Sequence, residues 1–102
     1  MRRTGIAFDR LCALSGLPAP VAEHRFHAVR KWRWDWSWPS QKVALEQHGG
    51  VFIQGKHSRG AGQMKDFEKW STAAADGWRV IHVTPSQLES TATLDLLRRA
   101  LA

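Results

Sequence analysis

Two strand-like runs in the sequence carry acidic side chains at spacings that suit a metal-dependent hydrolase. In the first run, residues 32–38, tryptophan takes every second position and Asp35 is one of the polar residues between the indoles. In the second run, Glu46 and His48 stand two apart and so share one side of a strand. If the runs pair, Asp35, Glu46 and His48 can lie on one face. Two carboxylates and an imidazole there would suit a hard divalent cation, Mg²⁺ or Mn²⁺, with positions left for water and substrate.

The elements that must position these side chains are a hairpin and a strand before it. Only Pro39, Ser40 and Gln41 separate the two runs, which is a connection of the length that joins antiparallel neighbours. Strict alternation predicts that the tryptophans are mostly core residues that pack the sheet against a helix, rather than a platform for stacking bases. The alternation over residues 23–29 predicts a further strand before the hairpin.

Helical spacing appears in three other segments. Residues 5–15 suit a short helix that Gly16 would end, and residues 63–76 suit a longer one that Gly77 would end. Thr84 followed by a proline predicts the start of a final helix with a leucine stripe. The leucines of that stripe are Leu88, Leu94, Leu97 and Leu101.

The order of these elements predicts the fold class. Residues 78–83 read as a β-strand, so the chain runs helix, three strands, helix, strand, helix. We expect a single α/β domain over residues 1–102, built around a mixed four-stranded sheet. The last strand should lie parallel to an earlier one, because a helical crossover precedes it.

Composition and charge narrow the class of partner. A chain of 102 residues with 43% apolar residues can build one modest core. The net charge of +6 and the pI near 10.5 favour a polyanionic partner, of which nucleic acid is the obvious candidate. Charge alone specifies no mechanism.

Cysteine usage and hydropathy bear on the compartment. Cys12 is the only cysteine, so an intrachain disulfide is impossible and an intracellular protein is expected. No stretch approaches the roughly 20 apolar residues that cross a bilayer. Asp9 and Arg10 interrupt the only segment that begins like a signal peptide, so we expect mature cytoplasmic protein without a membrane partner.

Blocks between residues 23 and 85 resemble the PD-(D/E)XK nuclease superfamily, in particular the small phage and bacterial endonucleases related to the very-short-patch repair enzymes and the DUF559 group. The blocks that carry the resemblance are EHRFHAVRKWRWDWSWP, KVALEQHGG, GKHSRGAG, KDFEKW and DGWRVIHVTP. The resemblance implies a restriction-endonuclease-like core in the order α-β-β-β-α-β.

The resemblance also implies roles for particular residues. Asp35 matches the aspartate of the family's second core strand and Glu46 the acid of its third, and both would bind metal. Glu23 matches an acid that adds an outer metal contact in some members. His48 stands where the family usually has Lys, Glu, Asp or Gln, and as a histidine it would ligate metal or act as a base. Lys69 would then be an active-site lysine that has migrated to the second helix.

The implied activity is metal-assisted hydrolysis of DNA phosphodiester bonds, with Mg²⁺ or Mn²⁺ as cofactor. Lys56, His57 and Arg59 on a glycine-rich loop would grip the flanking phosphates, together with Arg30 and Lys31. Cleavage of branched DNA is one form of this activity, and it would favour a homodimer because two strands must be cut. A phage or prophage origin would place the enzyme in the cytoplasm of a bacterial host.

Other interpretations of the same residues stay open. Asp35 can be a solvated residue paired with Arg33 or Lys42, and His48 a strand-end histidine bonded to a backbone carbonyl. The chain can be a catalytically inactive nucleic-acid-binding module of the same fold. It can also be an adaptor or inhibitor that binds a protein partner through its basic face.

Overall fold

The structure, a computed structural model, describes residues 7–49 and 61–102. Its elements are α1 (Phe8–Leu14), β1 (Val21–Arg25), β2 (Arg33–Trp38), β3 (Val43–Gln47), α3 (Ala61–Ala75), β4 (Arg79–Val83), the 3-10 turn η1 (Pro85–Gln87) and α4 (Thr91–Leu101). This order confirms the predicted α/β class and the sequence of helices and strands.

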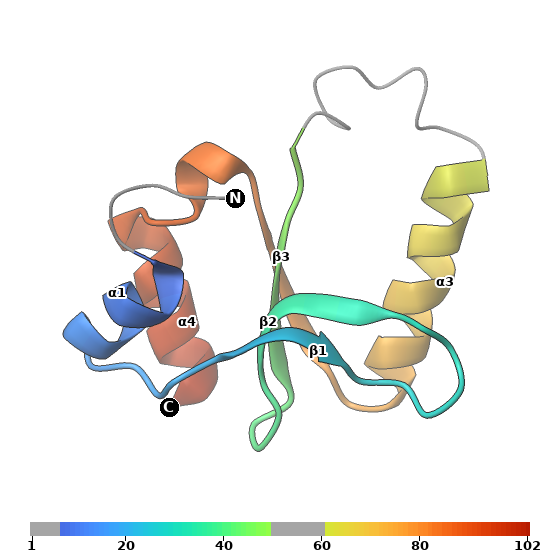
Figure 1. Cartoon of the computed structure of the whole chain (residues 1–102), viewed down its shortest axis with the longest axis horizontal. Helices are drawn as coiled ribbons and strands as arrows, with labels where there is room; N and C mark the ends of the chain where they lie inside the picture. The colour runs from blue at the N-terminus through green and yellow to red at the C-terminus, as the bar shows by residue number, and fades with distance from the viewer. Residues whose placement is uncertain (1–6, 50–60) are drawn as a thin grey trace.

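The four strands form one mixed sheet in the order β1-β2-β3-β4. β1, β2 and β3 are antiparallel neighbours, and β4 lies parallel to β3. The crossover through α3 was therefore predicted correctly. Helices α1 and α4 lie on one side of the sheet and α3 lies on the other (Figure 1).

The hairpin between β2 and β3 has the predicted short turn. The Gln41 N–H donates to the Trp38 carbonyl at 3.1 Å, and the Lys42 N–H donates to the Pro39 carbonyl at 3.1 Å. Opposite pairs then follow in regular register from Trp38 and Val43. The turn thereby determines which residues of the two acidic strands face each other.

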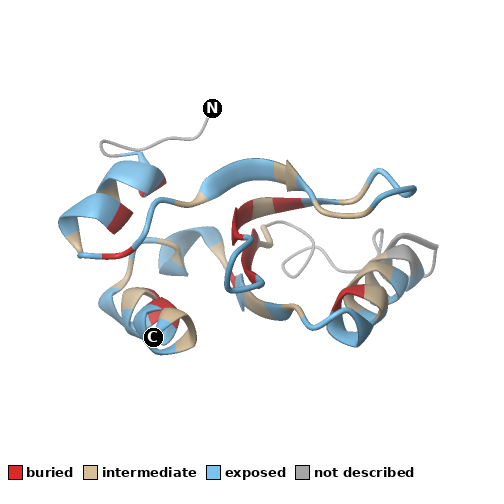
Figure 2. Cartoon of the chain, turned by 90° about the horizontal axis from the view of Figure 1, so that it is seen from below, coloured by how far each residue is buried: buried red, intermediate tan, exposed pale blue. Residues whose placement is uncertain are grey.

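The sheet separates two hydrophobic cores, and the buried residues concentrate on its central strands (Figure 2). The larger core lies under α1 and α4 and consists of Phe8, Cys12, Leu17, Trp36, Trp38, Val43, Leu45, Val83 and Leu97. The smaller core lies under α3 and consists of Trp34, Ala44 and Ala73, with Phe26, Trp70, Trp78 and Val80 packed against it. The prediction that most tryptophans are core residues is confirmed.

The prediction of one shared face for the tryptophans of β2 is wrong. Trp36 packs against the ring of Phe8 with centroids 4.8 Å apart, whereas Trp34 stacks on Phe26 in the core under α3. The strand turns over between them, at Asp35.

The neighbouring strand β1 also switches faces, at the position opposite Asp35, and the backbone conformation of Glu23 explains the switch. The pairs Ala22–Trp36 and His24–Trp34 place Glu23 opposite Asp35, but these two residues are not themselves a ladder pair. Glu23 has a φ of 54°, a left-handed conformation that costs a residue with a Cβ about 1 kcal/mol. This backbone rotation interrupts the alternation on which the single-face prediction depended.

The first strand ends earlier than predicted, at Arg25 instead of residue 29. The cause is His27, whose Nδ1 accepts the N–H groups of Val29 at 3.1 Å and Arg30 at 2.9 Å. These amides bond to a side chain and not to a neighbouring strand. The segment after β1 is therefore a turn.

The final helix begins later than predicted. Thr84 and Gln87 close a separate turn, because the Thr84 N–H donates to Gln87 Oε1 at 3.0 Å and the Gln87 N–H donates to the Thr84 carbonyl at 3.0 Å. α4 starts only after Ser90, whose Oγ accepts the Thr93 N–H at 3.1 Å. Leu88 thus precedes the helix, although it still packs against the larger core.

Two glycines end helices as predicted. Gly16 has a φ of 77° and Gly77 a φ of 94°, conformations that suit a residue without a Cβ. After α3 the Trp78 N–H donates back to the Ala73 carbonyl at 2.9 Å. In the described parts of the chain, no helix combines the length and the apolar character that a membrane span requires.

Candidate active site

Glu46 is the buried acid at the centre of the candidate site. It lies on β3, is 7% exposed and faces α3. Its Oε1 accepts a hydrogen bond from Lys69 Nζ at 2.8 Å, and its Oε2 accepts the main-chain N–H of Asp35 at 3.1 Å. The carboxylate is therefore held in place by donors from β2 and α3.

Lys69 reaches this acid from the middle of α3. Its Nζ also donates to the Arg33 carbonyl at 2.7 Å and lies 4.9 Å from the centre of the Trp34 ring. The side chain is only 13% exposed, so the ammonium group has a defined position. A fixed positive charge thus lies beside Glu46. It comes from Lys69 of α3 and not from the position two residues after Glu46, where this chain has His48.

Burial dominates the electrostatics of Glu46. Desolvation raises the pKa of its carboxyl group, and the nearby Asp35 raises it further, while the hydrogen bond and charge of Lys69 act in the opposite direction. The net shift is upward. An additional positive charge at this carboxylate would therefore stabilise its ionised form.

Asp35 lies next to Glu46 along the strand pair but departs from the predicted shared face. Its Oδ2 accepts the Gln47 N–H at 2.8 Å, and it lines a cavity on the α1 side of the sheet. The turning over of β2 explains this departure. The proposed partners of a merely solvated Asp35 are engaged elsewhere: Arg33 Nε lies 3.9 Å from Glu23, and Lys42 Nζ donates to the Asp76 carbonyl at 2.6 Å.

His48 lies on the same side of the sheet as Glu46, as predicted, and it belongs to a small cluster of rings beside α3. Its Nε2 lies 2.7 Å from His82 Nδ1, so one of the two rings donates to the other. Its ring also meets Trp70 edge-on, with centroids 5.5 Å apart. Burial lowers the pKa of both histidines. The main-chain N–H of His48 donates to the Val83 carbonyl at 2.7 Å.

His82 is the residue at this site that the sequence analysis did not single out. It pairs with Glu46 in the parallel ladder between β3 and β4. The two residues are far apart in the sequence, so only the pairing of β3 with β4 identifies them as neighbours. The only indication in the sequence that His82 belongs to the site was that a histidine stands in the last predicted strand.

Glu23, the predicted outer metal contact, lies beside Asp35 and lines the same cavity. Its side chain is 59% exposed and its closest charged partner is Arg33. The structure thus brings Glu23 to Asp35 and places it on the α1 side of the sheet, away from Lys69.

Of the five predicted DNA-binding residues, the structure describes Arg30 and Lys31. Arg30 forms a two-pronged ion pair with Glu68 of α3, at 2.6 Å and 3.2 Å, and its guanidinium lies 4.2 Å from the Trp32 ring centre. Lys31 is exposed. Lys56, His57 and Arg59 lie outside the described residues.

Asp35 and Glu46 are the two carboxylates that adjoin each other where β2 and β3 pair. No group of three or more His, Cys, Asp or Glu side chains in residues 7–49 and 61–102 forms a metal cage. Mg²⁺ does not need one, because one or two carboxylates with water and substrate phosphate satisfy it. Asp35 and Glu46 supply two carboxylates from adjoining strands, with the Asp35 side chain lining the cavity on the α1 side and Glu46 facing α3.

Comparison of the chain with protein-family models, with curated proteins and with solved structures finds no match.

Proposed function

We propose that the protein is a Mg²⁺- or Mn²⁺-dependent endodeoxyribonuclease of the PD-(D/E)XK type. The contact of Lys69 Nζ with Glu46 Oε1, at 2.8 Å, is the observation that carries this proposal. A lysine paired with a buried acid, next to a second acid from the adjoining strand, is a donor set that supports metal-assisted phosphodiester hydrolysis.

Asp35 and Glu46 would hold the cation. When bound, it supplies polarisation of a phosphoryl oxygen and acidification of a coordinated water. Lys69 places its ammonium group where negative charge develops on the substrate, and its bond to the Arg33 carbonyl keeps that group oriented. His48 and His82 lie on the same side of the sheet and shape the border of the site towards β4.

The charge of the chain supports DNA as substrate. A net charge of +6 favours phosphate contacts that do not depend on sequence. Arg30 and Lys31, with Lys56, His57 and Arg59, are the residues that we assign to these contacts. Cleavage of branched DNA by a homodimer in the cytoplasm is the form of the activity that we propose.

The test is incubation of the purified protein with supercoiled, linear and branched DNA in Mg²⁺, Mn²⁺ or EDTA. The wild type is compared with Asp35→Ala and Lys69→Met. Lys42→Met is a matched control, because Lys42 also donates to a backbone carbonyl but lies at the hairpin turn, away from Glu46. We expect metal-dependent cleavage by the wild type and by Lys42→Met only.

Intact DNA under all conditions would overturn the proposal. Tight, salt-sensitive DNA binding without cleavage would then identify a catalytically inactive binding module. Absence of both cleavage and DNA binding would favour a protein partner for the basic face.

A further inference from the structure

Trp32 is the tryptophan of residues 32–38 that lies outside both hydrophobic cores. It precedes β2, is half-buried, and belongs to neither cluster of core residues in the part of the chain that the structure describes. Its ring lies 6.2 Å from that of Phe26, with the planes 21° apart, and Phe26 in turn stacks on Trp34 at 4.1 Å. A series of flat rings thus leads from the core under α3 to the surface at Trp32.

Arg30 continues this series outside the core. Its guanidinium carbon lies 4.2 Å from the centre of the Trp32 ring, which is a stacking distance. Its Nη1 and Nη2 groups donate to the carboxylate of Glu68 at 2.6 Å and 3.2 Å, so the indole and the carboxylate together orient the guanidinium plane. The Arg30 side chain is nevertheless 42% exposed. A guanidinium that rests on a ring with one face, and is held at its edge, presents its other face to solvent.

The end of the β1–β2 pair beside Trp32 is basic. Arg25 and Arg33 are directly opposite in the antiparallel ladder, and both are exposed. Like charges at opposite positions destabilise a sheet. Glu23 offsets this repulsion only in part, because it lies 3.9 Å from Arg33 and is itself 59% exposed. Lys31, next to Trp32, adds a further exposed cation. A bound phosphate backbone would relieve the repulsion that the fold leaves at this end of the sheet.

We propose that Arg30, supported by Trp32, stacks against an unpaired base of single-stranded DNA next to the cleaved bond. This inference rests on the proposed function, because it names the part of the DNA substrate that the protein recognises. Unpaired bases stack on aromatic rings and guanidinium planes, whereas the bases of a duplex already stack on each other. The position suits the substrate, since Lys69 of the candidate site donates to the carbonyl of Arg33, the residue after Trp32.

The stacking face and the hydrogen-bonding edge of Arg30 are separate. Its N–H groups lie in the guanidinium plane and point to Glu68, where a DNA phosphate can replace the carboxylate. Stacking uses the flat face and needs no such exchange. A lysine at this position would keep the charge and lose the plane. Because every base has a π-face, we expect a preference for unpaired over paired DNA with little preference for sequence.

The test measures DNA binding in EDTA, so that neither metal binding nor cleavage contributes. Fluorescence anisotropy gives the Kd for a labelled oligothymidylate, for an abasic strand of equal length and for a duplex. We expect the wild type to bind oligothymidylate about fivefold or more tightly than the abasic strand, which carries the same phosphates. Arg30→Lys and Trp32→Ala should each lower the affinity for oligothymidylate about fivefold or more. Arg30→Lys should leave the affinity for the abasic strand and the salt dependence unchanged.

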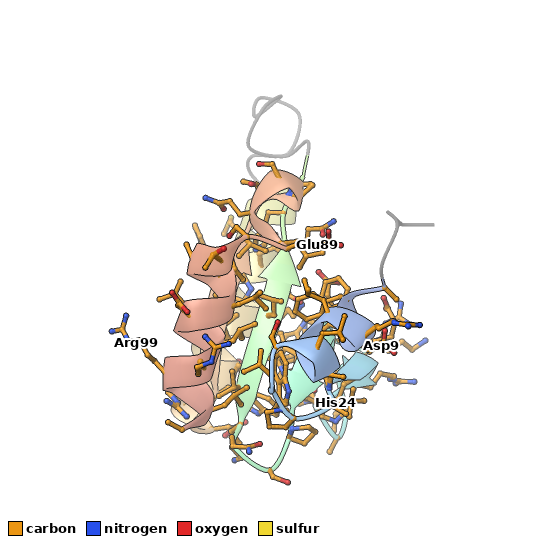
Figure 3. The ribbon with its side chains drawn as sticks, turned by 90° about the vertical axis from the view of Figure 1, so that its left-hand side faces the viewer. Asp9, His24, Glu89 and Arg99 are labelled. Atoms are coloured by element: carbon orange, nitrogen blue, oxygen red, sulfur yellow. The ribbon has the colours of Figure 1, made fainter. Side chains whose placement is uncertain are left out.

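Arg99→Lys is the matched control, because it also replaces an exposed guanidinium by an ammonium group. Arg99 lies on α4, on the other side of the sheet from α3, and its side chain points away from the protein (Figure 3). Its replacement should leave the affinity for all three DNA molecules as it is in the wild type.

Several results would overturn the proposal. They are absence of binding to oligothymidylate, equal affinity for the abasic strand, tighter binding of the duplex, and undiminished affinity of Arg30→Lys. An equal loss with Arg99→Lys would also overturn it, because the effect would then not belong to the stack at Trp32. The nuclease proposal fails by a different result, absence of metal-dependent cleavage, so the two failures are distinguishable.

Discussion

Lys69 and Glu46 form a buried ion pair between a helix and a strand that are 23 residues apart at this point, with Nζ 2.8 Å from Oε1. The exposed fractions of the two side chains are 13% and 9%. A buried pair that loses one partner leaves an uncompensated charge, so both residues are sensitive positions for stability as well as for chemistry.

Replacement of Lys69 separates these two roles. Lys69→Met should lower metal-dependent cleavage about 10²-fold or more, because an oriented donor at the reacting group is lost. It should also destabilise the fold by about 3 kcal/mol, since Glu46 stays buried and charged. The double variant Lys69→Met/Glu46→Gln should recover stability in denaturant unfolding but not cleavage. Cleavage at the wild-type rate by folded Lys69→Met would contradict the assigned role.

Glu46 should make the stability of the metal-free protein depend on pH. Burial raises its pKa from the ordinary 4.5, so the folded state holds this proton more tightly than the unfolded state. The free energy of unfolding should therefore fall as the pH rises from 4.5 to the folded pKa, and then level off. Thermal unfolding in EDTA between about pH 4 and 7 should show this step in the wild type and not in Glu46→Gln. Identical pH profiles of stability for the wild type and Glu46→Gln would contradict this role of the Glu46 proton.

Cys12 predicts a loss of stability at alkaline pH. Burial raises the pKa of its thiol from 9.0 to about 12, and Asp9 adds to the shift. The folded state retains the proton that the unfolded state releases. Between pH 9.0 and 12, the unfolding free energy should thus decline by up to about 1.4 kcal/mol per pH unit.

Chemical denaturation of the wild type and Cys12→Ala across this range would measure the decline, which the variant should lack. The thiol should also react with a thiol reagent only when the protein unfolds, because it is fully buried. Rapid labelling of the native protein would show that the helix α1 opens locally.

Arg30 and Glu68 offer a test of the DNA-binding face. The ion pair raises the pKa of Arg30 and lowers that of Glu68, so the arginine stays charged, and a DNA phosphate would compete with Glu68 for its exposed guanidinium. Arg30→Gln should weaken DNA binding and reduce the slope of log Kd against log salt by about one. Glu68→Gln should strengthen binding by removing a competing carboxylate. The same slope in all three proteins would remove Arg30 from the phosphate contacts.

Much of the fold could be predicted from local patterns. Helical spacing and the glycines at positions 16 and 77 identified α1 and α3, and alternation with a short turn identified the β2–β3 hairpin. These features depend on neighbours within a few residues in the chain. The parallel placement of β4 followed from the crossover helix alone.

Other features depend on contacts between distant residues and were not predicted. The left-handed backbone of Glu23 turns over two strands together, and no composition signal marks a glutamate for that conformation. The contact between His48 and His82 required the pairing of β3 with β4. The proximity of Lys69 to Glu46 was expected only through a family resemblance, because helix α3 has to dock before the two meet.

The single strand β2 supplies indoles to both cores, Trp34 to one and Trp38 to the other. Neither core can therefore unfold alone. Loss of the helices that cover one core would expose an indole of β2, and β2 also supplies an indole to the other core. We infer that the two layers unfold in one cooperative transition in spite of their separate interiors. Partial opening of the molecule near Asp35 would then be as rare as global unfolding.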